Sequence, residues 1–373
     1  MTDDTLFAPA SGFGRAAIAV IRVSGPAAAA LVTALAGRLP VPRRLSLRTL
    51  RDPADGSILD QALVAWLPGP DTVTGEDMAE LHLHGGLAVR AGVIRALSAF
   101  PGCRAAEPGA FTRRAVLNGR MGLTEAEGVA DLIEAETEAQ RRQALRQLDG
   151  VLGRQVAAWR AEAVDCLAGA EAALDFSDEG DVDEAALDAA LFARAAALRD
   201  AVAAALADGR RGERLREGFH VVLAGPPNAG KSTLLNALSR RDAAIVSPVP
   251  GTTRDAIEVR LDLGGLPVIL VDTAGLRETA DAVEAEGIAR TRRRMEAADL
   301  VLMLEPPGAA AAETAAGPAR VLRLRTKCDV ADGSGAGGLA VSALTGAGMP
   351  ALLAAIQAEA GRALGGGDAL VTR

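Results

Sequence analysis

The sequence predicts an α/β domain with a phosphate-binding loop, preceded by an α+β domain and a helical domain. In the first third of the chain, short segments of alternating apolar and polar residues mix with helical segments. Apolar residues then recur at steps of three and four, and a glycine-rich loop follows an apolar run near residue 225. We therefore expect domains at residues 1–118, 119–217 and 218–362, with a short tail at 363–373.

The N-terminal domain is predicted from its mixture of strands and helices. Alternating residues indicate strands at 16–23, 61–66 and 78–84, and a helix is expected at 87–100. Strands and helices in this arrangement are typical of an α+β domain.

The middle domain is predicted to be helical from residue 123 to about 217. Leu145, Leu148, Leu152, Val156 and Trp159 follow one another at helical spacing and form an apolar stripe. Such a stripe is more often buried within one chain than by a partner, and we expect its packing surface to be C-terminal helices that this sequence lacks.

The most informative segment is Gly225–Ser232, which has the pattern G-x-x-x-x-G-K-S. It lies between an apolar run at 219–224 and a helical segment at 233–238, as a P-loop requires. Backbone N–H groups and the helix N-terminus bind phosphate in such a loop. The alternative is an ordinary glycine-rich turn, and the two flanks favour the P-loop. We expect nucleotide contacts from Asn228, Ala229, Gly230, Lys231, Ser232 and Thr233, with Lys231 at the β- and γ-phosphates and Ser232 on Mg²⁺.

Two further motifs follow in the order that a GTPase needs. The loop at 247–255 is rich in proline and small residues, which predicts a switch that orders around the γ-phosphate and Mg²⁺. Strands predicted at 257–262 and 267–271 lead to an Asp-Thr-Ala-Gly motif, whose carboxylate can hold the water shell of the metal. From these segments we expect nucleotide contacts by Ser247, Thr252, Thr253, Asp272, Thr273, Ala274 and Gly275, with Thr253 also on Mg²⁺.

Base recognition is predicted after a strand at 321–325. Thr326-Lys327-Cys328-Asp329 stands where GTPases normally have Asn-Lys-x-Asp. Asp329 can accept hydrogen bonds from guanine N1 and N2, whereas the Thr326 hydroxyl offers fewer contacts than an asparagine amide. Ser342 and Ala343, after a strand at 339–341, fit the last loop that contacts guanine. We expect GTP rather than ATP, held with weakened affinity or discrimination.

Composition limits the classes of function. The net charge of −8 argues against a chain that coats nucleic acid, which would need a local basic patch or the surface of a partner. Three scattered cysteines without a C-x-x-C pair indicate neither a disulfide framework nor a zinc site. Because the sequence shows no signal peptide and no apolar run of membrane length, we expect a cytoplasmic protein without a membrane partner.

Motifs outside the GTPase set give the chain a resemblance to a known family. They are IAVIRVSG at 18–25, TGED at 74–77, ELHLHGG at 80–86, PGAFTR at 108–113 and LTEAE at 123–127. In this order and spacing they resemble the MnmE (TrmE) family of tRNA modification GTPases over essentially all of residues 1–365. The resemblance implies a P-loop GTPase domain, a helical middle domain and an N-terminal domain of folate-binding type.

The resemblance also implies an activity and partners. Members install a carboxymethylaminomethyl-type group at C5 of the wobble uridine in certain tRNAs. They act with a flavin-containing MnmG partner and take a one-carbon unit from a folate of the 5-formyltetrahydrofolate type. Arg22, Glu80 and Arg120 fall at the folate-contacting positions, and Arg120 stands where lysine is usual. A homodimer through the N-terminal domain is implied as well.

The groups that hydrolyse GTP are implied in the same way. Glu284 falls at the position of the family's catalytic glutamate, in a catalytic set with Lys231 and Thr253. From the residues alone, Glu284 would be an ordinary solvated acid on a helix. The resemblance further implies a potassium ion that neutralises charge in place of an arginine finger, with ligands from Asn228, Ser247, Val249 and Thr252.

The chain departs from the family at its C-terminal end. Members continue through further helices to a Cys-x-Gly-Lys tail, and this sequence ends at Arg373 without that motif. From the motifs and the resemblance, the expected function is a GTP-hydrolysing tRNA modification protein, with two alternatives. One is a GTP-binding protein that has lost the modification step by truncation, and the other is a ribosome-assembly-type GTPase. The folate-type motifs of the N-terminal domain count against the second alternative.

Overall fold

The structure is a computed structural model of the 373-residue chain. It describes residues 4–175, 184–241, 243–245, 258–272, 295–308, 320–330 and 338–365. The chain divides into two compact units, Met1–Ala126 and Glu127–Arg373, which are taken in turn below.

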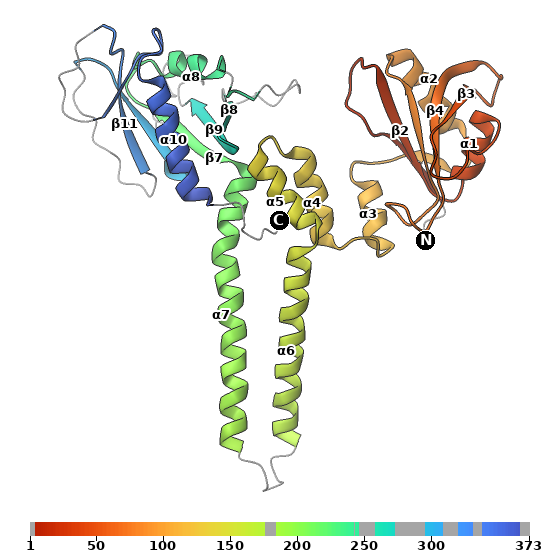
Figure 1. Cartoon of the computed structure of the whole chain (residues 1–373), viewed down its shortest axis with the longest axis horizontal. Helices are drawn as coiled ribbons and strands as arrows, with labels where there is room; N and C mark the ends of the chain where they lie inside the picture. The colour runs from red at the N-terminus through yellow and green to blue at the C-terminus, as the bar shows by residue number, and fades with distance from the viewer. Residues whose placement is uncertain are drawn as a thin grey trace, which may run out of the picture. The chain divides into compact units, whose positions relative to one another are not determined.

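The first unit is built on a six-stranded sheet with the order β3-β4-β5-β2-β1-β6 (Figure 1). Its strands are β1 (Thr5–Pro9), β2 (Ile18–Ser24), β3 (Ser46–Arg51), β4 (Ile58–Leu67), β5 (Met78–His84) and β6 (Cys103–Ala105). Neighbouring strands are antiparallel, apart from the parallel pair β1 and β6. The helices of this unit include α1 (Ala28–Ala36), α2 (Leu87–Ala99) and α3 (Ala110–Leu117).

Buried and half-buried side chains alternate along the strands, so this sheet has one buried face and one half-open face. Leu81 and Leu83 of β5 are buried, whereas His82 between them is half-buried. Helices α1 and α2 contribute Leu31 and Leu97 to the same core as Leu81 and Leu83. Successive side chains of a strand point to opposite faces, so the half-open face carries the polar residues of β2 and β5.

A buried ionic network fixes one end of the first unit. The Arg114 guanidinium of α3 donates to the carboxylates of Glu76, at 2.9 Å, and Asp4, at 2.6 Å. The Ser24 hydroxyl donates to Glu76 at 2.8 Å. The side chains of Arg114 and Glu76 are only 6% and 7% exposed. Buried charges persist when they are paired in this way, so the network ties α3 to the loop before β5.

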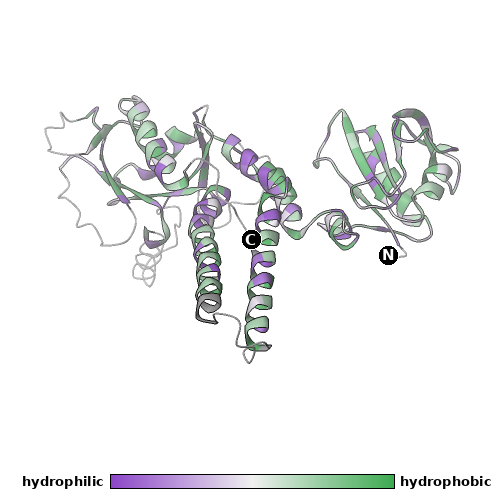
Figure 2. Ribbon diagram, turned by 60° about the horizontal axis from the view of Figure 1, so that its bottom comes forward, coloured by the Kyte–Doolittle hydropathy of each residue, from purple (hydrophilic) through white to green (hydrophobic). Residues whose placement is uncertain are grey.

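The helical part of the second unit confirms the predicted helical region. Its helices are α4 (Leu123–Glu134), which begins in the first unit, α5 (Glu138–Leu148), α6 (Val151–Asp175) and α7 (Glu184–Glu217). Helices α6 and α7 lie side by side as a long pair (Figure 1). Both carry hydrophobic and hydrophilic residues along their length (Figure 2). Helix α5 begins with a capping box between Thr137 and Gln140.

The prediction that Leu145 to Trp159 form one continuous apolar stripe on a helix is wrong. Gly150 has a φ of 73° and separates α5 from α6, so Leu145 and Leu148 lie on a different helix from Leu152 and Val156. Leu152 is buried, whereas Val156 is 47% exposed. The spacing of apolar residues missed the break because the pattern continues across the glycine, which adopts a left-handed conformation without strain.

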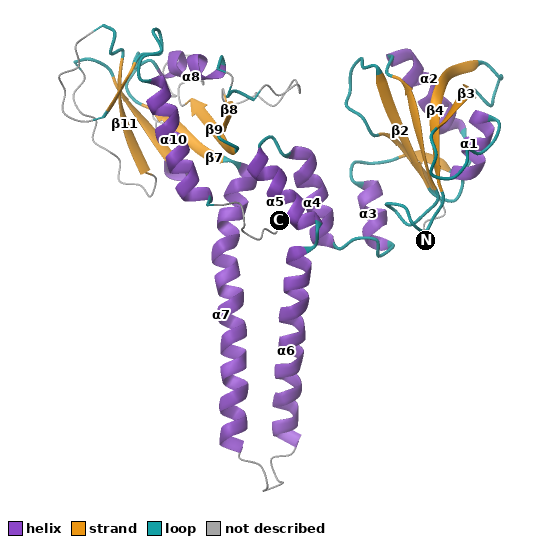
Figure 3. Ribbon diagram, viewed as in Figure 1, coloured by secondary structure: helices purple, strands orange, loops and turns teal. Residues whose placement is uncertain are grey.

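The α/β part of the second unit contains a six-stranded sheet with the order β12-β11-β10-β7-β9-β8 (Figure 3). Its elements are β7 (Phe219–Ala224), α8 (Lys231–Ser239), β8 (Glu258–Leu263), β9 (Leu266–Asp272), β10 (Leu300–Glu305), β11 (Arg320–Thr326), β12 (Leu339–Val341) and α10 (Met349–Leu364). Strand β8 is antiparallel to β9, and the other neighbouring pairs are parallel. The carboxyl ends of the parallel strands therefore meet at one edge, where open α/β sheets bind ligands.

The helical part packs directly on this sheet. The Ala139 N–H of α5 donates to the Gly265 carbonyl in the β8–β9 turn at 3.1 Å. Arg260 of β8 pairs with Glu136 at 3.0 Å. The Gln140 side chain donates to the Arg216 carbonyl near the end of α7. These contacts explain why the helical and α/β parts form one compact unit.

The sequence-based strands are confirmed with small shifts at their ends. The strand expected at 16–23 is β2 at Ile18–Ser24, and the helix expected at 87–100 is α2, which ends at Ala99. Domain boundaries at 118 and 217 stay predictions, because the division into two units does not separate the helical part from the α/β part. Within the described ranges, every helix is too short or too polar to cross a bilayer.

We predict that Arg114→Ala destabilises the first unit by about 3–5 kcal/mol, because it leaves the buried Glu76 carboxylate without its cation. Arg51→Ala removes an exposed arginine of the same unit and should change stability by less than about 0.5 kcal/mol. Urea unfolding in a Trp159→Phe background isolates the fluorescence of the buried Trp66. Equal unfolding midpoints for the two arginine variants would contradict the structural importance of the network.

Candidate nucleotide-binding site

The P-loop lies at the carboxyl edge of the sheet, between β7 and α8. Strand β7 ends at Ala224, and α8 begins at Lys231. Gly225 has a φ of 147°, and a Cβ at this residue would lie 2.6 Å from the Leu304 carbonyl oxygen of β10. Gly230 also adopts a left-handed conformation, with a φ of 95°. Glycine is thus required at 225 both by the close contact with Leu304 and by the backbone conformation. At 230 it is required by the backbone conformation alone.

Lys231 folds back over the P-loop. Its ammonium group donates to the carbonyl oxygens of Gly225, at 2.7 Å, and Pro226, at 3.0 Å. Burial lowers the pKa of this group, and the Asp272 carboxylate opposes the shift. A partly desolvated cation with carbonyl partners can exchange them for the phosphate oxygens of a ligand.

Ser232 and Asp272 meet beside the loop, as their predicted roles require. The Ser232 hydroxyl donates to the Asp272 carboxylate at 2.8 Å. Asp272 ends β9, and the parallel pairing of β7 with β9 places it next to the start of the loop. The side chain of Asp272 is fully buried. A hydroxyl and a carboxylate are oxygen ligands of the kind that Mg²⁺ takes, so this pair fits a magnesium ion.

A cavity of about 360 Å³, which we call the loop cavity, opens next to the P-loop. Its predicted lining residues are Ala229, Gly230, Thr233, Thr326, Lys327, Asp329, Ser342 and Ala343. Lys327 has a φ of 57°, which turns the chain sharply after β11. Sequence reasoning missed the apolar walls formed by Leu234, Val330 and Val341, because these residues carry no motif. Leu344, which also lines the cavity, follows Ser342 and Ala343 in the loop predicted to contact guanine.

The remaining predicted contacts to nucleotide and ions lie outside the described residues. They are Ser247, Val249, Thr252, Thr253, Thr273, Ala274, Gly275 and Glu284. Among the four predicted potassium ligands, Asn228 lies within the residues that the structure describes. It has a φ of 62°, which is uncommon for a residue other than glycine.

In the first unit, the structure joins two of the three predicted folate residues. Arg22 of β2 lies opposite Glu80 of β5, and its guanidinium donates to one carboxylate oxygen at 2.9 and 3.1 Å. His82 Nε2 lies 3.3 Å from the other oxygen of Glu80, a contact that sequence reasoning missed. The Arg120 side chain packs over Gly75 in another loop.

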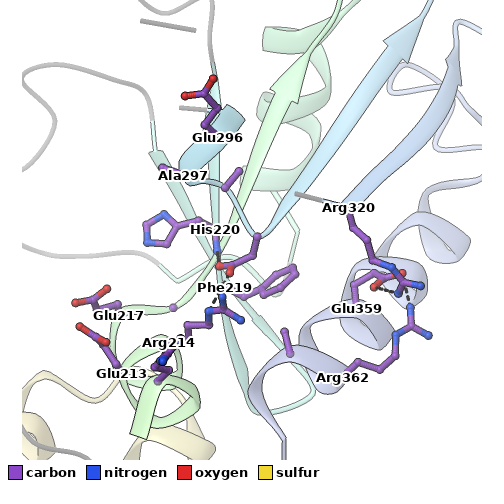
Figure 4. Close-up of a pocket in the computed structure, with 15 residues that line it drawn as sticks. Glu213, Arg214, Glu217, Phe219, His220, Glu296, Ala297, Arg320, Glu359 and Arg362 are labelled. Atoms are coloured by element: carbon purple, nitrogen blue, oxygen red, sulfur yellow. Dashed lines mark hydrogen bonds and ion pairs between the residues drawn. The ribbon is translucent and has the colours of Figure 1, made fainter. Parts of the chain in front are cut away.

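A second and larger cavity, of about 680 Å³, lies at the amino ends of β7 and β11. We call it the charged cavity. Figure 4 shows Arg320 and Arg362 beside Glu359, and both arginines form ion pairs with it. Arg214 pairs with Asp299 at 3.3 Å. Cations and carboxylates thus pair with one another in the charged cavity, whose described lining contains none of the predicted site residues. Eight of the predicted nucleotide contacts line the loop cavity instead.

Two protein families match the chain. Residues 5–120 match the family described as GTP-binding protein TrmE N-terminus. Residues 123–373 match the MnmE helical domain. The two matches meet within a few residues of the division between the two compact units.

Named relatives align with nearly all of the chain. The tRNA modification GTPase MnmE of Methylorubrum populi is 74% identical over 372 residues, which cover 100% of this chain and 84% of the relative. The protein of the same name from Methylobacterium radiotolerans is 74% identical, over 99% of this chain and 85% of the relative. Among solved structures, the G domain of the T. maritima FeoB iron transporter is 25% identical, with a TM-score of 0.29, over 38% of this chain and 98% of that domain.

We predict that Gly225→Ala lowers the affinity for GDP at least about tenfold, because the new Cβ displaces the P-loop from the Leu304 carbonyl. Gly365→Ala is the matched control: this glycine also has a positive φ but no atom within 4 Å of the added Cβ. Titration with a fluorescent GDP analogue measures both variants, and thermal unfolding checks that they are folded. An unchanged affinity for Gly225→Ala would mean that the close approach does not set the loop's position.

Proposed function

The chain belongs to the MnmE family of tRNA modification GTPases, and from this premise we propose which residues bind and hydrolyse its GTP. The chain is a GTP hydrolase with a P-loop α/β domain. We propose that the P-loop and the loop cavity together form the GTP site. The observation that carries this proposal is the convergence of three segments, at 229–234, 326–330 and 341–344, on one cavity.

The P-loop is assigned to the phosphates. Its backbone N–H groups and the N-terminus of α8 supply partial positive charge, and the Lys231 ammonium, which now donates to the Gly225 carbonyl, would contact the β- and γ-phosphates. Ser232 and Asp272 would hold Mg²⁺ directly or through water, with Thr253 as a further ligand. When bound, Mg²⁺ neutralises charge on the phosphates.

The loop cavity is assigned to guanine. The Asp329 carboxylate accepts hydrogen bonds from guanine N1 and N2, which adenine cannot supply in the same arrangement. The aliphatic part of Lys327 covers the ring, and Ser342 and Ala343 close the other side. Leu234 and Val330 supply apolar walls for a planar ring.

Hydrolysis is assigned by resemblance to the family. Glu284 orients the attacking water, while Lys231 and Thr253 hold the γ-phosphate and its metal. A potassium ion held by Asn228, Ser247, Val249 and Thr252 supplies positive charge when bound. Asn228 has a left-handed backbone, a conformation that asparagine adopts more readily than most residues.

We further propose that GTP hydrolysis serves the modification of C5 of the wobble uridine, together with a flavin-containing MnmG-type partner in the cytoplasm. The match of residues 5–120 to the TrmE N-terminus supports a folate of the 5-formyltetrahydrofolate type, bound by Arg22, Glu80 and Arg120. The first unit would also form the homodimer. With a net charge of −8, the chain would contact tRNA chiefly through the complex with its partner.

We predict that Lys231→Ala lowers GTP turnover about a hundredfold or more, because it removes the charge that faces the transferred phosphate. Arg240→Ala removes an exposed cation just past the other end of α8 and should leave turnover unchanged. Release of phosphate from GTP by the two purified variants provides the comparison. Normal turnover in Lys231→Ala would overturn the assignment of the P-loop.

Expression in a strain without its own MnmE tests the tRNA proposal, with the Methylorubrum populi relative as the positive control. We expect nucleoside mass spectrometry to show the modified wobble uridine with the wild-type chain, but not with Lys231→Ala. Absence of modification beside normal GTP turnover would contradict the proposal, and it would support a GTPase that has lost the modification step.

A further inference from the structure

Thr326 connects the base-binding segment to the P-loop. It is the last residue of β11, and it is only 7% exposed. Its hydroxyl donates to the carbonyl oxygen of Ala229 at 2.8 Å, across 97 positions of the sequence. Ala229 is itself fully buried, so this hydroxyl satisfies a carbonyl that the protein shields from solvent.

This hydrogen bond uses the donor capacity of the Thr326 side chain. A threonine hydroxyl has a single O–H, whereas an asparagine amide has two N–H groups. The O6 and N7 atoms of guanine are acceptors, and they need a donor from the protein. With its O–H committed to Ala229, Thr326 has no further proton to offer to either atom.

The contact also completes the anchoring of the P-loop. At the start of the loop, Gly225 packs closely against the Leu304 carbonyl at the end of β10. Four residues later, Ala229 is held by Thr326 at the end of β11. Strands β10 and β11 are adjacent and parallel, with Leu304 paired to Leu324. Two neighbouring strand ends therefore fix the two ends of the turn that carries Asn228.

We propose that Thr326 is a positioning residue, which holds the P-loop against the base-binding segment and does not itself recognise guanine. This inference rests on the GTP site proposed above. It assigns discrimination of the base to Asp329 and a purely geometric task to Thr326. Loss of the Thr326 hydroxyl should then weaken every ligand that uses the P-loop by the same factor, whatever its base carries at O6 or N7.

Double-mutant cycles on the full chain test whether Thr326 contacts the base. They combine a change of the Thr326 side chain with a change of one guanine atom, and only groups in contact give non-additive effects on affinity. Calorimetry with Thr326→Val, Thr326→Ser and the wild type measures the affinities for GDP, 7-deaza-GDP and 6-thio-GDP. We expect Thr326→Val to bind all three ligands about five- to a hundredfold more weakly, by a common factor, since it leaves the Ala229 carbonyl buried and unpaired. Thr326→Ser keeps the O–H and should stay within about twofold of the wild type.

Asp329→Ala provides the control for a true contact with the base. This substitution should lower the affinity for inosine diphosphate, which lacks the N2 amine, by a smaller factor than the affinity for GDP. An equal effect on both ligands would reject the assignment of Asp329 in the proposed GTP site while leaving the role of Thr326 intact. Failure of the wild type to bind GDP would overturn both.

Three results would overturn the role of Thr326 alone. Its valine variant would lose affinity for GDP but not for 7-deaza-GDP or 6-thio-GDP if the hydroxyl contacted N7 or O6. An unchanged affinity for all three ligands would show that the bond to Ala229 has no part in binding. Equal losses in the serine and valine variants would assign the effect to packing of the threonine methyl group.

Discussion

The parallel pairing of β7, β9, β10 and β11 is the constraint on which the candidate site depends. It brings the ends of these strands to one edge, where β7 leads into the P-loop and β9, β10 and β11 each contribute a contact to it. Leu304 presents its carbonyl to Gly225, Asp272 accepts from Ser232, and Thr326 donates to Ala229. The P-loop is thus shaped by the ends of three other strands of the sheet as well as by its own glycines. A side chain at Gly225 is incompatible with this arrangement, because the Leu304 carbonyl occupies the space.

The second unit also links this edge to the helical part. The β8–β9 hairpin leads directly into Asp272, and its turn contacts α5 through Gly265 and Ala139. Arg260 and Glu136 add an ion pair to the same junction. One hairpin thus carries both a site residue, Asp272, and the contact to α5. In the first unit, the buried pair of Arg114 and Glu76 plays a comparable structural role.

Local pattern was sufficient to predict the parts of the site that depend on short stretches of sequence. The P-loop, the strand that ends in Asp272 and the Lys327–Asp329 segment each carry a motif within a few residues, and the structure gathers their described members at one edge. Long-range contacts had no such signal. The bond from Thr326 to Ala229 spans 97 positions, and the local motif predicted only a weakened contact between Thr326 and guanine. The turn at Gly150 was missed for the opposite reason, because a regular apolar spacing continued through it.

A crystal structure of the chain with GDP and Mg²⁺ is the most direct test of the central claim, that the loop cavity and the P-loop form one guanine nucleotide site. The account predicts the guanine ring in the loop cavity, with N1 and N2 on the Asp329 carboxylate. It also predicts the diphosphate over the N–H groups of Gly225–Ser232, and the Thr326 hydroxyl still on the Ala229 carbonyl. Nucleotide bound in the charged cavity, or a guanine ring outside the loop cavity, would contradict the account.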